Sequence, residues 1–120
     1  MGRRRLRAVN RSRDTVLVED GSVADSAWSR LRGLLGHKPL QAGEGLLLRG
    51  ERAIHTVGMG FSIDVLFLDR FGKVKHAILS MGPLRFSPFV RSAVDVLELP
   101  AGTISRTGTM LGDEILLEFS

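Results

Sequence analysis

Hydrophobic and polar residues alternate with a period of two along most of the chain after Gly45. Glycine and proline interrupt the alternation at intervals of about eight to twelve residues, which is typical of short β-strands joined by turns. The strands predicted from this pattern are 45–50, 53–57, 62–69, 73–79, 93–99 and 114–119. Two earlier runs, 5–10 and 15–21, are expected to form a hairpin through the turn RSRD.

One segment has helical periodicity instead, and it begins at Ser22. Ser22 and Asp25 match a capping box, while Gly36 and Pro39 would end the helix. The apolar residues that recur on one helical face are Ala24, Ala27, Trp28, Leu31, Leu34 and Leu35. The sequence therefore predicts a mainly β (α+β) fold, either a compact β-sandwich or a partly closed barrel, with one N-terminal amphipathic helix.

Length and composition favour a single domain over residues 1–120, because 120 residues can bury one core of ordinary size. The chain has no cysteine, which excludes disulfides, thiolate metal sites and cysteine nucleophiles. No long apolar run and no secretion-signal pattern are found, so we expect a soluble, cytoplasmic protein that does not enter a membrane.

The net charge of +4 is concentrated at the amino end. Six of the 17 basic residues precede Asp14, which leaves 11 basic residues against 13 acids in the rest of the chain. We interpret residues 1–7 as a basic arm with a frayed tip that leads into a charged edge strand. The alternative is nonspecific nucleic-acid association through Arg3, Arg4, Arg5 and Arg7, although no aromatic residue lies among these arginines to stack on bases.

Polar residues at positions where the strand pattern calls for apolar ones mark the candidate site. Asp64 shares its strand face with Leu66 and Leu68, and Glu98 shares its face with Val94 and Val96. A buried carboxylate needs a partner, because an isolated charge in an apolar environment costs several kcal/mol. For Asp64 three partners are open: amides of the preceding glycine loop, a bound ligand, or Arg30 or Arg32 of the predicted helix.

The turn DRFG at 69–72 allows two registers for the flanking strands, depending on whether Gly72 forms a bulge. In one register His76 lies on the Asp64 face, and in the other it does not. The three histidines, His37, His55 and His76, lack the close spacing of a metal site, and no cofactor motif is present. We therefore expect neither a metal nor a cofactor.

The motifs SRLRGLLGHKPL, GLLL, IHTVGM, IDVLFLD, GKVKHAI and VLELPAGT, followed by GD before the last strand, resemble the family called domain of unknown function 192. The resemblance runs from about Asn10 to Phe119. It implies a compact, mostly β domain with one early helix and no established activity. Its motif positions correspond here to Arg30, Gly33, Leu34, His55, Thr56, Met59, Asp64, Glu98 and Gly112, while Ser62 replaces a proline common in the family.

The leading hypothesis is a noncatalytic domain, an accessory or binding module for a small ligand or peptide, with a polar site around His55–Asp64. Its candidate ligand-binding residues are His55, Thr56, Met59, Asp64, Arg30 and Glu98. The glycines of this loop would let a ligand approach backbone amides. The enzyme alternative is a small hydrolase or metal-assisted enzyme that uses His55 and Asp64. No catalytic residue is assigned.

Overall fold

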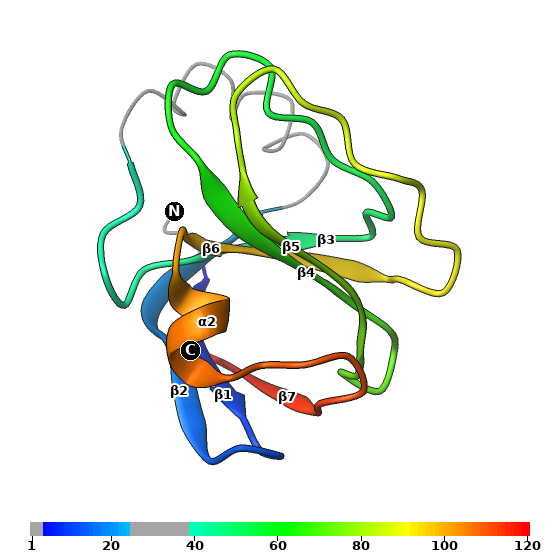
Figure 1. Cartoon of the computed structure of the whole chain (residues 1–120). Helices are drawn as coiled ribbons and strands as arrows, with labels where there is room; N and C mark the ends of the chain where they lie inside the picture. The colour runs from blue at the N-terminus through cyan, green and yellow to red at the C-terminus, as the bar shows by residue number, and fades with distance from the viewer. Residues whose placement is uncertain (1–3, 25–38) are drawn as a thin grey trace.

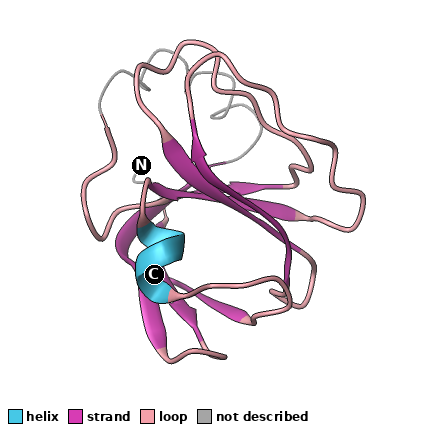
Figure 2. Cartoon of the chain, viewed as in Figure 1, coloured by secondary structure: helices cyan, strands magenta, loops and turns pink. Residues whose placement is uncertain are grey.

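The computed structural model describes residues 4–24 and 39–120. Seven strands form one sheet in the order β5-β4-β6-β3-β2-β1-β7, and the sheet curls into a half-barrel (Figure 1). The strands are β1 (Arg5–Asn10), β2 (Thr15–Ala24), β3 (Leu46–Arg49), β4 (Ile63–Leu68), β5 (Val74–Met81), β6 (Asp95–Pro100) and β7 (Ile115–Phe119). One short helix, α2 (Thr103–Thr107), follows β6 and contacts β2. Long loops make up much of the remaining described chain (Figure 2).

The two edge strands of the sheet, β5 and β7, approach each other at one end only. There the amide of Val74 donates to the carbonyl of Asp113 at 2.9 Å, and the amide of Ile115 donates to the carbonyl of Gly72 at 2.8 Å. Of the two predicted architectures, the single curled sheet corresponds to the partly closed barrel and not to the sandwich. The mainly β class is confirmed.

The core has two parts, one on each side of the sheet. The first lies inside the curl and draws on most strands and on α2: Leu6, Ala8, Leu17, Val18, Leu47, Leu66, Leu68, Val74, Leu97, Leu99, Ile104 and Ile115. The second lies on the outer face of β3, β4 and β6, under the loops at 50–62 and 82–94: Ala24, Leu48, Ile54, Met59, Ile63, Val65, Phe67, Met81, Ala93 and Val96. Because β4 and β6 are covered on both faces, all of β4 is buried.

The predicted amino-terminal hairpin is confirmed, since β1 and β2 pair antiparallel through the turn after Asn10. The interpretation of this segment as an edge strand is wrong, because β1 lies between β2 and β7. Its alternating residues explain this position: Leu6 and Ala8 pack in the core, while Arg7 faces outward and pairs with Glu118 of β7.

The predicted start of the amphipathic helix at Ser22 is also wrong. Ser22 pairs with Arg5 and with Leu46, and β2 continues to Ala24. These backbone pairings on both sides of β2 outweigh the local capping pattern, and no N-terminal amphipathic helix is shown within residues 4–24 and 39–120. The rest of the predicted helix, from residue 25 to 35, lies outside the described residues. In the described residues, helix α2 lies between the strands predicted at 93–99 and 114–119, where no helix was expected.

The segment 53–57 is not a strand of the sheet, contrary to the prediction. It forms only an isolated bridge, between His55 and Phe86. Its alternation nevertheless has a structural meaning: Ile54 and Thr56 are buried, while His55 and Val57 are exposed. The segment therefore forms one side of an irregular two-stranded ribbon that packs on the second part of the core, called the outer core below; the first part is called the inner core.

Candidate functional site

Both oxygens of the buried Asp64 carboxylate accept hydrogen bonds from backbone amides. Asp64 is 1% exposed, and its Oδ1 accepts a hydrogen bond from the amide of Ser80 at 2.9 Å. Its Oδ2 accepts from the amides of Gly102 at 3.1 Å and Ile104 at 2.8 Å. These three bonds offset the cost of removing the charge from water. As predicted, polar groups bond to this buried acid. The donors lie in β5 and in the first turn of α2, however, and not in the preceding glycine loop.

Asp64 provides the N-terminal cap that helix α2 lacks in its own sequence. The residue at the cap position is Gly102, which has no side chain to accept from the free amides of the first turn. Gly102 also has φ 97°, a left-handed conformation that favours glycine. A carboxylate near a helix N-terminus is favourable, so Asp64 fixes α2 to the start of β4.

The observed register of the β4–β5 hairpin separates His76 from Asp64. His76 pairs with Phe67, and their ring centroids lie 5.5 Å apart. Phe67 belongs to the outer core, whereas the neighbours of Asp64 on its own face, Leu66 and Leu68, belong to the inner core. His76 and Asp64 therefore do not form a functional pair.

Asp64 and Glu98 also lie on opposite faces of the sheet. In the pairing of β4 with β6, Asp64 stands opposite Leu99 and Glu98 stands opposite Val65. Leu99 packs in the inner core and Val65 in the outer core. Since directly paired residues share a face, the sheet itself lies between the two carboxylates. One site cannot hold both side chains.

Thr56 connects two loops through hydrogen bonds. It is fully buried, and its hydroxyl donates to the carbonyl of Gly82 at 2.6 Å and accepts from the amide of Arg85 at 2.8 Å. Its backbone amide donates to the carbonyl of Arg85, and its carbonyl accepts from the amides of Met59 and Leu84. Thr56 thus holds the loop at 50–62 against the loop at 82–94.

Among the candidate residues within the described chain, His55 is the exposed one. Its ring lies 5.8 Å from the ring of Phe86, centroid to centroid, and its Nδ1 accepts from the amide of Val57 at 3.3 Å. Met59, in contrast, is buried in the outer core, and Glu98 is buried as well. Arg30 lies outside the described residues. The predicted set therefore divides into one exposed side chain and several interior ones.

Hydrogen bonds along the two loops form a ribbon that we call the His55 ribbon, made of residues 52–57 and 84–90. The amide of Ser87 donates to the carbonyl of Ile54 at 2.9 Å, and the amide of Val90 donates to the carbonyl of Arg52 at 2.8 Å. Large apolar side chains project from this ribbon: Phe86 is 75% exposed, Leu84 71%, Phe89 67% and Val57 43%. Exposed apolar residues clustered in this way are characteristic of binding surfaces.

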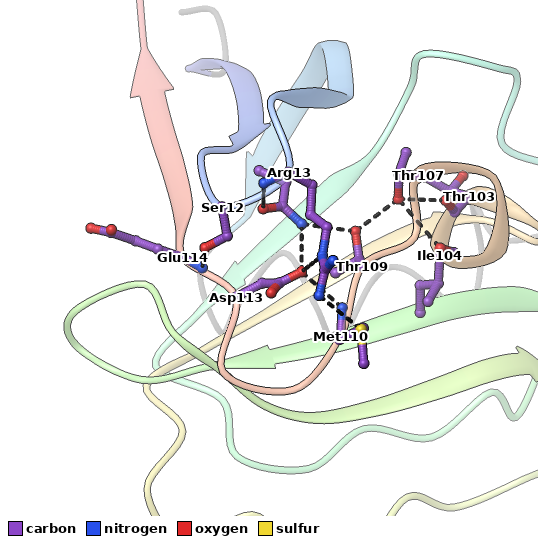
Figure 3. Close-up of polar contacts among 10 residues, drawn as sticks. Ser12, Arg13, Thr103, Ile104, Thr107, Thr109, Met110, Asp113 and Glu114 are labelled. Carbon is purple, nitrogen blue, oxygen red and sulfur yellow. Dashed lines mark hydrogen bonds and ion pairs between the residues drawn. The ribbon is translucent and has the colours of Figure 1, made fainter.

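A buried polar network that sequence reasoning missed lies at the turn before β7 (Figure 3). Oδ2 of Asp113 accepts from Asn10 Nδ2 at 3.0 Å, from Arg13 Nε at 3.0 Å and from the amide of Met110 at 2.9 Å. Burial of Asp113 acts to raise the pKa of its carboxyl, but the hydrogen bonds and the Arg13 charge outweigh burial, so this pKa lies below its usual value.

The network continues through hydroxyl groups to helix α2. Nδ2 of Asn10 donates to Thr109 Oγ1 at 3.1 Å, the hydroxyls of Thr109 and Thr107 lie 2.7 Å apart, and Thr107 donates to the carbonyl of Thr103. The sequence contains one signal for it, since Asn10 continues the inward-facing series of Leu6 and Ala8 with a polar side chain. Each member bonds to at least one other, so the network stabilises the fold.

Two open clefts lie on the side of the sheet formed by β1 and β2. One, of about 400 Å³, is lined by residues that include Arg5, Glu19 and Phe119. The other, of about 390 Å³, is lined by residues that include Thr15 and Arg106. Neither is lined by a predicted ligand-binding residue, although Arg5 and Arg7 of the first cleft belong to the amino-terminal arginines considered for nucleic-acid association. Among the described residues, no group of three or more histidine, aspartate and glutamate side chains could hold a metal ion, and no helix is long and apolar enough to cross a membrane.

The chain belongs to the DUF192 family, described as uncharacterized ACR, whose model matches residues 8–117. Among solved structures it is similar to a protein of Sinorhizobium meliloti 1021 described as a "putative transcription regulator", with 23% identity over 96% of this chain and 93% of that one and a TM-score of 0.78. It is also similar to a protein of unknown function from Novosphingobium aromaticivorans DSM 12444, with 18% identity over 93% of this chain and 83% of that one and a TM-score of 0.76. These likenesses show the fold. No curated protein matches the chain.

Proposed function

We propose that this chain is a noncatalytic binding or accessory domain that recognises a small ligand or a peptide at the His55 ribbon. The observation that supports this proposal is the set of exposed apolar side chains on the His55 ribbon, of which Phe86 lies against the His55 ring. The buried Thr56 holds the two loops of the ribbon together. An apolar surface of this kind costs solubility, and it is typically kept because a partner covers it. A cytoplasmic location, suggested by the absence of cysteine, is part of the same proposal.

In this proposal the candidate residues have different tasks. His55 contacts the ligand, Thr56 and Met59 hold the ribbon on the outer core, and Asp64 fixes helix α2. Glu98 is buried beneath the loops on the outer face of the sheet. Arg30 remains a candidate for contact with the ligand.

The enzyme alternative based on His55 and Asp64 has less support. The loop of His55 packs on the outer face of β4 through Ile54, whereas Asp64 points to the inner face. A carboxylate that already accepts three amide hydrogen bonds is also a poor general base, because taking up a proton would weaken those bonds. Nucleic-acid association through the amino-terminal arginines is weakened in turn by the ion pairs of Arg5 with Asp20 and of Arg7 with Glu118.

An NMR titration tests the proposal. The ¹⁵N-labelled chain is titrated with metabolite and peptide libraries, and we expect chemical-shift changes in residues 54–57 and 84–90. The variant Phe86→Ala should lose these changes. The matched control Phe71→Ala should keep them, because Phe71 is 64% exposed and lies in the β4–β5 turn. A screen without any shift in the ribbon would contradict the proposal.

A further inference from the structure

The His55 ribbon and its continuation carry positive charge without any acid. Residues 52–63 and 82–94 contain three arginines, Arg52, Arg85 and Arg91, and one histidine, but no aspartate or glutamate. All three arginines are exposed. The bias is local, because the chain as a whole has 13 acids against 17 basic residues, and most of it mixes the two.

Several exposed arginines elsewhere on the surface are paired with acids, although Arg11 and Arg70, in the β1–β2 and β4–β5 turns, have no ion pair with a described residue. Arg5 pairs with Asp20, Arg7 with Glu118, and Arg49 with Asp95. Within the described part of the chain, Arg85 and Arg91 form no such pair. An apolar surface flanked by unpaired cations is complementary to a partner that combines apolar side chains with negative charge.

The backbone of the ribbon indicates which kind of anionic partner fits. The amides of Leu84, Arg85, Ser87 and Val90 donate to the 52–56 segment, but the amide of Phe86 donates no hydrogen bond to any described residue. This amide, at the outer edge of the ribbon, can donate to the carbonyl of an added peptide strand. A lipid interior would instead leave it unsatisfied. The exposed aliphatic side chains of Leu84 and Val57 also suit a peptide better than nucleic-acid bases, which stack on aromatic rings.

We propose that the partner of the His55 ribbon is a protein segment in which acidic side chains alternate with apolar ones. This inference rests on the function proposed above and makes it more specific. Apolar side chains of the segment pack on Phe86, Leu84 and Phe89, its carboxylates pair with Arg85 and Arg91, and its backbone accepts from the amide of Phe86. Because the charges are exposed, binding weakens as salt concentration rises.

The test measures fluorescence anisotropy of a labelled peptide in which Asp and Glu alternate with Leu and Phe, added to the full chain. Two further probes keep the same length: one has Lys in place of the acids, and the other has Ser in place of the apolar residues. We expect the acidic apolar peptide to bind at least roughly tenfold more tightly than either. The double variant R85E/R91E should lose a similar factor, while the matched control R11E/R70E should not, because Arg11 and Arg70 lie in the β1–β2 and β4–β5 turns.

Other outcomes would overturn the inference. Equal affinity for the lysine peptide would remove the role of charge, and binding to phosphatidylglycerol vesicles or to oligo-dT without binding to the peptide would assign the surface to lipid or nucleic acid. If uncharged or basic ligands shift residues 54–57 and 84–90, the binding function stands and the acidic partner is wrong. If no ligand shifts these residues, both proposals fail.

Discussion

Replacing Asp64 by asparagine removes one negative charge and one acceptor from a buried carboxylate that accepts three amide hydrogen bonds. The asparagine oxygen can still accept from two amides, those of Gly102 and Ile104, but its amide group then faces the amide of Ser80, donor against donor. A hydrogen bond to a charged group contributes about 1.5–3 kcal/mol, and the two remaining bonds also weaken when the charge is lost. We therefore expect Asp64→Asn to lower the free energy of unfolding by about 2–4 kcal/mol.

Urea unfolding followed by circular dichroism measures this change. The matched control is Asp14→Asn, because Asp14 is exposed and its φ of 55° is one that asparagine tolerates. The control should change stability by less than about 0.5 kcal/mol. A cost for Asp64→Asn as small as that of the control would refute the assignment of Asp64 as the cap of helix α2.

Two further predictions concern the turns near β7. Because the folded-state pKa of Asp113 is lowered, the stability that its carboxylate contributes is present above its unfolded pKa of about 3.9 and is lost as pH falls through the folded pKa. Urea unfolding at a series of pH values tests this. Asp113→Asn should be less stable than the parent near neutral pH, and the difference in the free energy of unfolding should shrink below about pH 4. Gly72→Ala should destabilise by more than Gly50→Ala, although both glycines have φ 79°, because a Cβ at Gly72 would overlap the carbonyl of Ile115 and a Cβ at Gly50 would meet nothing. We expect about 1 kcal/mol for Gly50→Ala and at least about 1 kcal/mol more for Gly72→Ala by urea unfolding, and equal costs would contradict the close approach of the β4–β5 turn to β7.

Periodicity predicted most of the strands because a strand of this sheet buries at least one face. β4, β5, β6 and β7 follow alternating or continuous apolar runs, and the β1–β2 hairpin follows its turn. The segment 53–57 alternates equally well, yet it pairs only at His55. Local alternation shows that one side of a segment is buried, but not whether the neighbour that covers it is a sheet or a loop.

The pairing of distant segments was beyond local sequence patterns. The turn at 69–72 allowed two strand registers, and the register decides on which face of the sheet His76 lies. The observed pairing contains a register shift between Phe67 and Leu68, which the turn sequence alone did not determine. The separation of Asp64 from Glu98 followed only from the register of β4 against β6. The sequence did identify Asp64 as an acid that needs polar partners, but its partners at Gly102 and Ile104 are 38 and 40 residues away along the chain.

The proposed binding surface also differs from the predicted one: it consists mainly of exposed apolar residues, whereas the prediction centred on polar residues. The prediction emphasised acids and histidines on strand faces, because such residues are costly in a core. Phe86 and Phe89 carry no such signal, since an aromatic residue in a chain of unknown fold is first assigned to the core. Their exposure follows from the way the loop at 82–94 packs against His55, which local sequence patterns do not predict.

The most direct test of the His55 ribbon as the binding surface is paramagnetic broadening of amide signals by a nitroxide-labelled peptide in which acidic and apolar residues alternate. We expect broadening centred on residues 54–57 and 84–90. Broadening centred instead on Ser80 and on Gly102–Ile104, around Asp64, would contradict this expectation, as would a spectrum that the peptide leaves unchanged.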